Sequence, residues 1–272
     1  MTLPLEGVRV LAVEQYGAGP FGTQFLADQG AEVVKIENPN DGGDFARNVG
    51  PFFFTPEHSE FFHAYNRNKK SLTLDLSQKE GLQVFQDLVK TSDAVASNLR
   101  GDVPEKLGLT YETLGAINEK IVCAHLSAYG RKGPRSSWPG FDYLMQAEAG
   151  YFSLTGEPDG PPQTTGMSLS DTTGGLHAFG AICAALYERT LVGNGQFIDI
   201  ALIDCVMWQN EWASQYLFLT GGKVEPKRYG NRRPILIPGN LFSGRDGWIS
   251  IAASTDPGWK NLTRAMGFPE LS

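Results

Sequence analysis

The stretch GVRVLAVEQYGAGPFGTQFLADQGAEVVKIE, residues 7–37, decides the fold class. It begins with a short valine-rich run at 7–13, which predicts a buried strand, and the glycine-rich turn GAGPFG at 17–22 follows. The next residues predict a helix that ends at Gly30, and AEVVKIE at 31–37 predicts a second strand. Strand, glycine turn, helix and strand form a βαβ unit, which predicts a parallel sheet covered by helices.

The same alternation of strand and helix continues along most of the chain. Further strands are predicted at 71–76, 93–99, 120–130 and 196–202, and further helices at 77–91, 103–118, after 171 and at 202–218. Near residue 220 the chain becomes rich in Gly, Pro and basic residues, and 241–254 predicts a hairpin. We therefore expect an α/β fold, with a Rossmann-like domain over 1–220 and a smaller, partial α+β domain over 221–272.

Composition and charge narrow the class of protein. A net charge of −7 argues against binding to nucleic acid or to an anionic membrane surface. The chain contains no apolar run long enough for a membrane span, and its first residues lack a basic segment followed by a long apolar stretch, so we expect no signal peptide. Its three cysteines, Cys123, Cys183 and Cys205, have no CxxC spacing, which predicts reduced thiols and a cytoplasmic location. The four histidines lack the spacing of a helical metal site, so we expect no bound metal.

The turn GAGPFG matches the dinucleotide-binding pattern G-x-G-x-x-G, and Glu37 ends the strand that follows. In a dinucleotide fold such an acid binds the ribose hydroxyls, while the glycines admit the pyrophosphate to the helix N-terminus. An NAD-dependent oxidoreductase is therefore one interpretation. The other is that Gly17, Gly19 and Gly22 only make a tight turn between strand and helix, which glycine does without any phosphate.

A second candidate site is Asp171 in SLSDTTGG, residues 168–175. It precedes a predicted helix whose N–H groups and positive dipole end favour an ionised carboxylate, and Gly174 and Gly175 leave room beside it for a bulky substrate. Asp171 is thus either a simple helix cap or a nucleophile, and the local stretch alone leaves both open.

Several segments together resemble a known family. They are LEGVRVLAVEQYGAGPFGTQFLADQGAEVVKIENPNDGGDFAR (5–47), NRNKKSLTLDL (66–76), SNLRGDVPEKLGL (97–109), HLSAYGRKGP (125–134), GFDYLMQAEAG (140–150) and SLSDTTGGLHAFGAICAALYERTLVGNGQFIDIAL (168–202). In order and across nearly the whole chain they are similar to the class III CoA-transferases, the group that includes formyl-CoA and crotonobetaine/carnitine CoA-transferases and the α-methylacyl-CoA racemases. The resemblance implies that acyl-CoA and small carboxylic acids are the substrates, that no cofactor is tightly bound, and that Asp171 is the catalytic nucleophile.

The resemblance also implies which residues bind CoA. The expected CoA-binding residues are Gln15, Tyr16, Gly17, Ala18, Asn38, Leu74, Asp75, Leu76, Ser77, Asn98, Leu99, Arg100, Lys106 and Phe141. Among them, 15–18 would surround the thioester arm, 74–77 and 98–100 would line the adenine and ribose, and Lys106 would meet a phosphate. Phe141 is expected either to contact the acyl group or to be an ordinary core aromatic.

The chain departs from the family pattern at several points. Racemases of the family have a histidine before the aspartate that corresponds to Asp142, and phenylalanine at position 141 cannot transfer a proton, so transfer is favoured over racemisation. Asn38 replaces an arginine of some relatives, and Gly17 replaces a glutamine of one branch, which argues against an oxalate-type acceptor. Relatives are longer and form an interlocked homodimer through a C-terminal segment. We expect a homodimer here too, and an inactive CoA-binding homologue is the remaining alternative.

Overall fold

The computed structural model describes residues 2–56, 58–232 and 235–272. The chain divides into two compact units. The first contains the residues up to 149 together with 166–210, and the second contains 150–165 together with 211–272. The second unit therefore includes 150–165 and begins again at Glu211, whereas the sequence predicted one boundary near residue 220.

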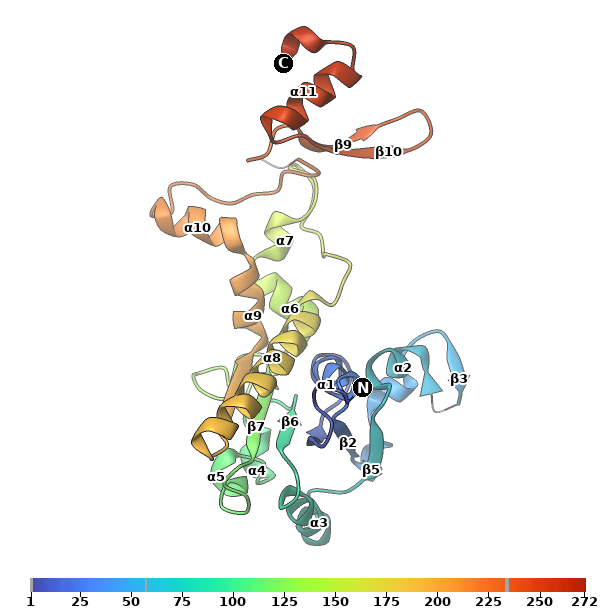
Figure 1. Ribbon diagram of the computed structural model, residues 1–272, viewed down its shortest axis with the longest axis vertical. Helices are drawn as coiled ribbons and strands as arrows, with labels where there is room; N and C mark the ends of the chain where they lie inside the picture. The colour runs from blue at the N-terminus through green and yellow to red at the C-terminus, as the bar shows by residue number, and fades with distance from the viewer. Residues whose placement is uncertain (1, 57, 233–234) are drawn as a thin grey trace. The chain divides into compact units, whose positions relative to one another are not determined.

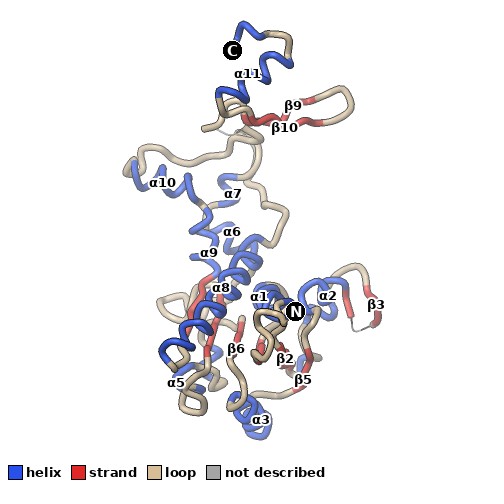
Figure 2. Tube along the Cα trace, viewed as in Figure 1, coloured by secondary structure: helices blue, strands red, loops and turns tan. Residues whose placement is uncertain are grey.

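The first unit is built on a six-stranded sheet in which every pairing is parallel. Its strands are β1 (Arg9–Val13), β2 (Glu32–Glu37), β5 (Lys70–Thr73), β6 (Ala94–Ser97), β7 (Val122–Ser127) and β8 (Phe197–Ala201). Their spatial order is β5-β2-β1-β6-β7-β8. Figures 1 and 2 show these strands alternating along the chain with helices, and the predicted α/β class is confirmed.

The order of the strands creates a switch point beside β1. The chain moves from β1 outward to β2 and β5, and then returns to the other side of β1 to form β6, β7 and β8. In open parallel sheets, ligands bind in the crevice at such a point, beyond the carboxyl ends of the two strands. Here that crevice lies after Val13 and after Ser97.

Both faces of the sheet are buried, and β1 shows why its sequence is almost continuously apolar. Val10 and Ala12 pack on one face with helix residues such as Ile182, whereas Leu11 and Val13 pack on the other face. Because side chains alternate along a strand, an uninterrupted apolar run supplies both layers of the core.

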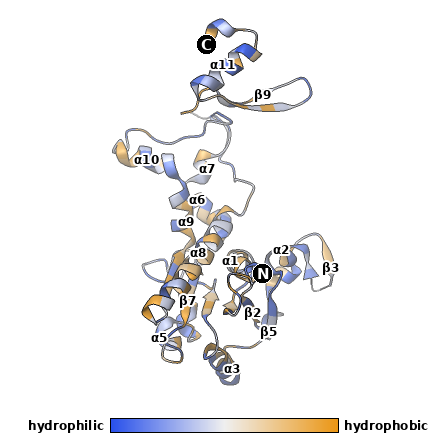
Figure 3. Ribbon diagram, in the orientation of Figure 1, coloured by the Kyte–Doolittle hydropathy of each residue, from blue (hydrophilic) through white to orange (hydrophobic). Residues whose placement is uncertain are grey.

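Helices cover the two faces. The helices of the first unit are α1 (Ala18–Asp28), α2 (Glu60–Asn66), α3 (Lys79–Val89), α4 (Val103–Lys106), α5 (Tyr111–Leu114), α6 (Asp142–Glu148), α8 (Leu169–Val192) and α9 (Leu202–Gln209). Helices α1 and α8 contribute to the core on one face of the sheet, and α3 and α5 contribute to the core on the other. Helix α8 carries both polar and apolar residues, and its middle, AFGAICAAL at 178–186, is almost entirely apolar (Figure 3). It lies against α1 at very short range, since a Cβ added to Gly22 would be 2.5 Å from the carbonyl oxygen of Gly175.

Short elements complete the first unit. A two-stranded hairpin pairs β3 (Phe53–Thr55) with β4 (His58–Ser59), and 3₁₀ turns occupy Pro39–Asp41 and Phe45–Asn48. The long helix predicted at 202–218 is two helices, because the chain breaks after α9 at Asn210, whose side-chain amide donates a hydrogen bond to the carbonyl of Ala149.

The second unit contains three helices and a hairpin among its described residues. They are α7 (Tyr151–Leu154), α10 (Glu211–Leu219), β9 (Gly239–Ser243), β10 (Trp248–Ala252), α11 (Asp256–Ala265) and a 3₁₀ turn at Pro269–Leu271. Strands β9 and β10 are antiparallel, and residues 244–247 connect them, as the sequence predicted.

Candidate active site

Asp171 lies in the first turn of α8, and its side chain is almost buried, with 8% of the residue exposed. Ser168, the residue at the N-cap position, makes no side-chain capping bond. The backbone N–H groups of Ser170 and Asp171 instead donate to Oδ1 of Asp142, over 2.7 and 3.2 Å. Asp171 is therefore not the cap of its own helix, and the capping interpretation of this residue is wrong.

Burial raises the pKa of the Asp171 carboxyl to about 7, and the neighbouring Asp142 carboxylate contributes to the rise. The helix terminus was expected to keep Asp171 ionised. It does less than expected because its nearest N–H donors are bonded to Asp142. Among the described residues, no cation forms an ion pair with Asp171. The result is a carboxylate more basic than a surface aspartate and poised to titrate near neutral pH.

The loop after β1 faces this carboxylate. A Cβ added to Gly17 would lie only 2.4 Å from Oδ2 of Asp171, so the glycine permits a close approach of the two segments. The loop is tied across the switch point by Asn98, which accepts from the N–H of Gln15 over 2.9 Å and donates to its carbonyl over 2.7 Å. The carboxyl ends of β1 and β6 are thus joined beside Asp171.

Tyr16 has a left-handed backbone, with φ of 66°, which is uncommon for a residue other than glycine. The backbone N–H of Tyr16 donates a hydrogen bond to Oδ1 of Asp44 over 2.9 Å. Its ring stacks on Phe45 and on Phe61, with centroid separations of 4.7 Å in both cases. These contacts stabilise a strained conformation at the edge of the candidate site.

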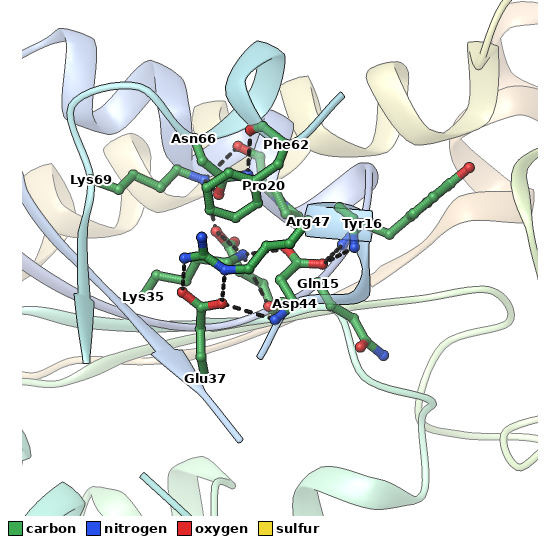
Figure 4. Close-up of polar contacts among 12 residues, drawn as sticks. Gln15, Tyr16, Pro20, Lys35, Glu37, Asp44, Arg47, Phe62, Asn66 and Lys69 are labelled. Atoms are coloured by element: carbon green, nitrogen blue, oxygen red, sulfur yellow. Dashed lines mark hydrogen bonds and ion pairs between the residues drawn. The ribbon is translucent and has the colours of Figure 1, made fainter. Parts of the chain in front are cut away.

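A buried charge network lies beneath the loop (Figure 4). Lys35, only 1% exposed, contacts Asp44 over 2.8 Å, and Lys69 contacts Glu14 over 2.8 Å. Burial opposes the charge on Glu14, but Lys69 and Lys35 outweigh it and lower the pKa of that carboxyl. Lys69 also donates to the carbonyl of Pro20 over 2.8 Å. The network therefore fixes both the end of β1 and the first turn of α1.

The glycine turn makes contacts that need no nucleotide. Beyond Gly17, a Cβ on Gly19 would lie 2.9 Å from the side chain of Asn98, and Gly22 faces the backbone of α8. Glu37 accepts both the Nε and Nη2 donors of Arg47, over 2.8 and 2.7 Å. Its pKa is about 2, because Arg47 and other donors outweigh burial. The residues of the dinucleotide pattern thus have protein partners.

Most of the residues predicted to bind CoA line two adjoining pockets. A pocket of about 400 Å³ is lined by Asp171 and by Gln15, Tyr16, Gly17, Ala18, Asn98, Leu99, Arg100 and Phe141. A second pocket, of about 220 Å³, is lined by Asn38, Leu74, Asp75, Leu76 and Ser77, and shares Gln15 and Leu99 with the first. Phe141 is 52% exposed, so it is not a buried core aromatic.

One predicted residue lies outside both linings. The ammonium group of Lys106 contacts Asp102 over 2.5 Å, and Arg100 contacts the same carboxylate over 2.5 Å. Arg100 and Lys106 thus flank one acid near the first pocket, with side chains that are 43% and 65% exposed.

Sequence reasoning missed other lining residues of the Asp171 pocket. They are Phe45, Val103, Leu126, Ser127, Ala128, Trp138, Pro139, Gly140 and Leu202. They come from the end of β7, from the loop before α6, from the 3₁₀ turn at Phe45–Asn48 and from the first residues of α4 and α9, and they carry no chemical signature of their own. A signal did exist for the charge network, since a lysine in the middle of the buried strand EVVKIE requires a partner.

Within 2–56, 58–232 and 235–272, no cluster of three or more His, Cys, Asp or Glu side chains is arranged to hold a metal ion. No helix of the described chain combines the length and apolarity needed to cross a membrane. All three cysteines are free, with Cys123 and Cys205 buried.

Comparisons with known proteins agree on one family. The sequence profile of CoA-transferase family III matches residues 5–272. A succinate–glutarate CoA-transferase of Agrobacterium fabrum is 37% identical, over 99% of this chain and 68% of that protein. An acetyl-CoA:oxalate CoA-transferase of Acetobacter aceti is 36% identical, over 99% of this chain and 68% of that protein.

The fold comparison agrees with the sequence comparison. The crystal structure of a CAIB/BAIF family protein from Brucella suis superposes with a TM-score of 0.88 and 36% sequence identity. The match covers 100% of this chain and 71% of that one. The chain therefore spans about two thirds of the length of the relatives that it matches.

Proposed function

This chain belongs to CoA-transferase family III and is a CoA-transferase, and from that premise we propose that Asp171 is its covalent nucleophile. The observation that carries the proposal is the placement, in a pocket at the switch point of the sheet, of a nearly buried carboxylate of raised pKa that has no cation partner in the described part of the chain. A structural carboxylate at that depth would be expected to have a cation or several donors as partners.

The reaction begins when an oxygen of Asp171 attacks the thioester carbonyl of an acyl-CoA. The new C–O bond replaces the C–S bond, which gives a mixed anhydride and free CoA thiolate. The thiolate then attacks the aspartyl carbonyl and releases the donor acid, leaving an aspartyl-CoA thioester. The acceptor carboxylate repeats these steps in reverse order, and Asp171 emerges as the free carboxylate. Proton transfer is not required, which fits a pocket that contains Phe141 where a racemase has histidine.

The two pockets divide the CoA molecule between them. We propose that the thioester arm lies in the pocket of Gln15 to Ala18 and Asp171, with Phe141 beside the acyl group. The second pocket combines apolar side chains such as Leu74 and Leu76 with the Asp75 carboxylate, and this combination suits an adenine ring and ribose hydroxyls.

Lys106 is the proposed phosphate contact, and we assign Arg100 to the phosphates as well, rather than to the adenine and ribose that the family resemblance implied. Both are partly exposed and share Asp102. Because exposed ion pairs contribute only about 0–1 kcal/mol, these cations can exchange Asp102 for a phosphate at little cost. We expect Arg100→Gln to raise the KM for acyl-CoA more than it lowers kcat.

CoA transfer is tested with a panel of donors and acceptors. Succinyl-CoA and acetyl-CoA are incubated with glutarate, succinate or oxalate, and the acyl-CoA products are separated by chromatography. We expect a new acyl-CoA with at least one pair, and its loss in Asp171→Asn. Asp204→Asn, on the neighbouring helix α9, is the matched control and should retain activity. Transfer that survives Asp171→Asn would refute the nucleophile. Tight CoA binding without any transfer would identify an inactive homologue, and reduction of NAD would identify the oxidoreductase.

We also propose a cytoplasmic homodimer. Free, mostly buried cysteines support a reducing compartment. Tyr187, Leu191 and Val192, at the end of α8, are between 60% and 70% exposed, and such apolar patches commonly mark association surfaces. The molar mass in solution, measured by light scattering, tests the dimer.

A further inference from the structure

Asp142 is the first residue of α6, yet its carboxylate completes the start of α8. Its Oδ1 accepts from the N–H of Ser170 over 2.7 Å, from the hydroxyl of Ser170 over 2.7 Å and from the N–H of Asp171 over 3.2 Å. The first N–H groups of a helix have no partner within the helix, so they need an acceptor from elsewhere. Asp142 supplies it across 28 residues of sequence.

The Asp142 carboxylate is itself held in place. Its Oδ2 accepts from Nε2 of Gln146 over 2.6 Å, and the same amide nitrogen donates to the carbonyl of Met167 over 2.9 Å. Gln146 is only 1% exposed. The loop before α8, the start of α8 and α6 are therefore joined through one carboxylate, next to the residue that is proposed to react.

We infer that Asp142 is a positioning residue for the reaction. It orients Asp171 through the start of α8, and its negative charge favours the covalent forms of Asp171 over the free carboxylate. The inference rests on the proposed function of Asp171. When Asp171 forms the anhydride or the thioester, its charge disappears, and the repulsion from Asp142 disappears with it. The free carboxylate is thus the form that Asp142 disfavours, and the covalent forms are those that it tolerates.

The groups around Asp171 support an electrostatic role for Asp142. Tyr16 and Tyr65 are the phenols that these carboxylates affect, since burial together with Asp171 and Asp142 raises the pKa of both. Of the other elements packed on α8, α9 carries Asp204 and Cys205, β7 carries Cys123 and His125, β8 carries Asp199, and α1 ends with Asp28. Among the described residues, only Asp142 contributes through its charge to the raised pKa of Asp171.

Two substitutions separate the hydrogen bonds from the charge. Asp142→Asn keeps an oxygen that can accept from the helix N–H groups but removes the charge and the acceptor of Gln146, whereas Asp142→Ala removes all three. Gln146→Leu removes the hydrogen bonds of Gln146 alone and isolates their contribution. Glu148→Gln is the matched control, because Glu148 lies on the same helix and accepts its hydrogen bonds from Tyr129 and Arg135, away from Asp171. Each variant is assayed for CoA transfer across pH 5–9, and its melting temperature is measured.

We expect Asp142→Asn to shift the acidic limb of the kcat profile downward by about 1 pH unit and to lower the yield of covalent adduct on Asp171. Asp142→Ala should lower kcat by at least about tenfold, since it also loosens the helix terminus. Glu148→Gln should match the wild type in rate and profile. A wild-type pH profile and rate in Asp142→Asn would overturn the inference. If Asp142→Asn behaves as the wild type while Asp171→Asn is inactive, the inference on Asp142 fails but Asp171 remains the proposed nucleophile. If Asp171→Asn still transfers CoA, both the nucleophile and the role of Asp142 are refuted.

Discussion

Substitution of Gly17 by alanine tests the geometry of the site in one step. The added Cβ would lie 2.4 Å from Oδ2 and 3.3 Å from Cγ of Asp171. A contact of carbon with oxygen is relaxed only near 3.5 Å, so the carboxylate must move by about 1 Å. The φ of Gly17 is −107°, outside the left-handed region that requires glycine, and the far end of a side chain is the part that yields.

A displacement of about 1 Å at a reacting group lowers the rate by about 100-fold, which corresponds to about 2.7 kcal/mol in the activation free energy. Folding stability should change much less. Alanine is a poorer N-cap residue than glycine, so we expect a loss of at most about 1 kcal/mol in the free energy of unfolding. Gly17→Ala is thus expected to be folded and nearly inactive.

The assay compares kcat with the free energy of unfolding from denaturant titration. Gly180→Ala is the matched control, because Gly180 lies in α8 and a Cβ there meets nothing within 4 Å. It should keep full activity and gain roughly 0.5–1 kcal/mol of stability. If Gly17→Ala retains kcat within a few-fold of the wild type, Asp171 does not react from the position seen in the structure.

Three further substitutions test the packing and the charges. Gly22→Ala should lower the free energy of unfolding by about 1–3 kcal/mol, because its Cβ meets the backbone oxygen of Gly175 and both helices must shift; an unchanged denaturation midpoint would contradict this. Lys69→Met should lower the free energy of unfolding by about 3–5 kcal/mol, because Glu14 then stays buried with one cation fewer beside it. A decrease below about 1 kcal/mol would show that this ion pair is dispensable for stability. Asp171→Asn should stabilise the protein by roughly 2–4 kcal/mol at pH 8. The folded state raises the pKa of Asp171 from 3.8 to about 7, so the gain should vanish below pH 4, and a gain that does not vary with pH would refute the shift.

The fold could be predicted because it depends on local patterns. The run at 7–13 is apolar on both faces of a strand, and this pattern requires a sheet that is covered on both sides. The break of the predicted helix 202–218 could not be predicted, because nothing in the local sequence excludes helix at Asn210. Its side chain bonds to Ala149, which is distant in the sequence.

The candidate site, too, could be predicted from the sequence only in part. Asp171 and the glycine turn could be identified from short motifs and a family resemblance. The role of Asp142 could not be predicted, since a local reading offers Asp171 as the cap of α8, whereas the acceptor comes from α6. The raised pKa of Asp171 was also unpredictable, because it depends on burial and on that same distant carboxylate.

The most direct test of the central claim is to trap the intermediate on Asp171. The wild-type protein and Asp171→Asn are incubated with succinyl-CoA, quenched with hydroxylamine and digested, and the peptide masses are measured. An acyl or thioester group on an aspartate is converted to a hydroxamate, so we expect a hydroxamate at Asp171 in the wild type and none in the variant. A hydroxamate on another residue, or CoA transfer with no hydroxamate at Asp171, would contradict the assignment of Asp171 as the nucleophile.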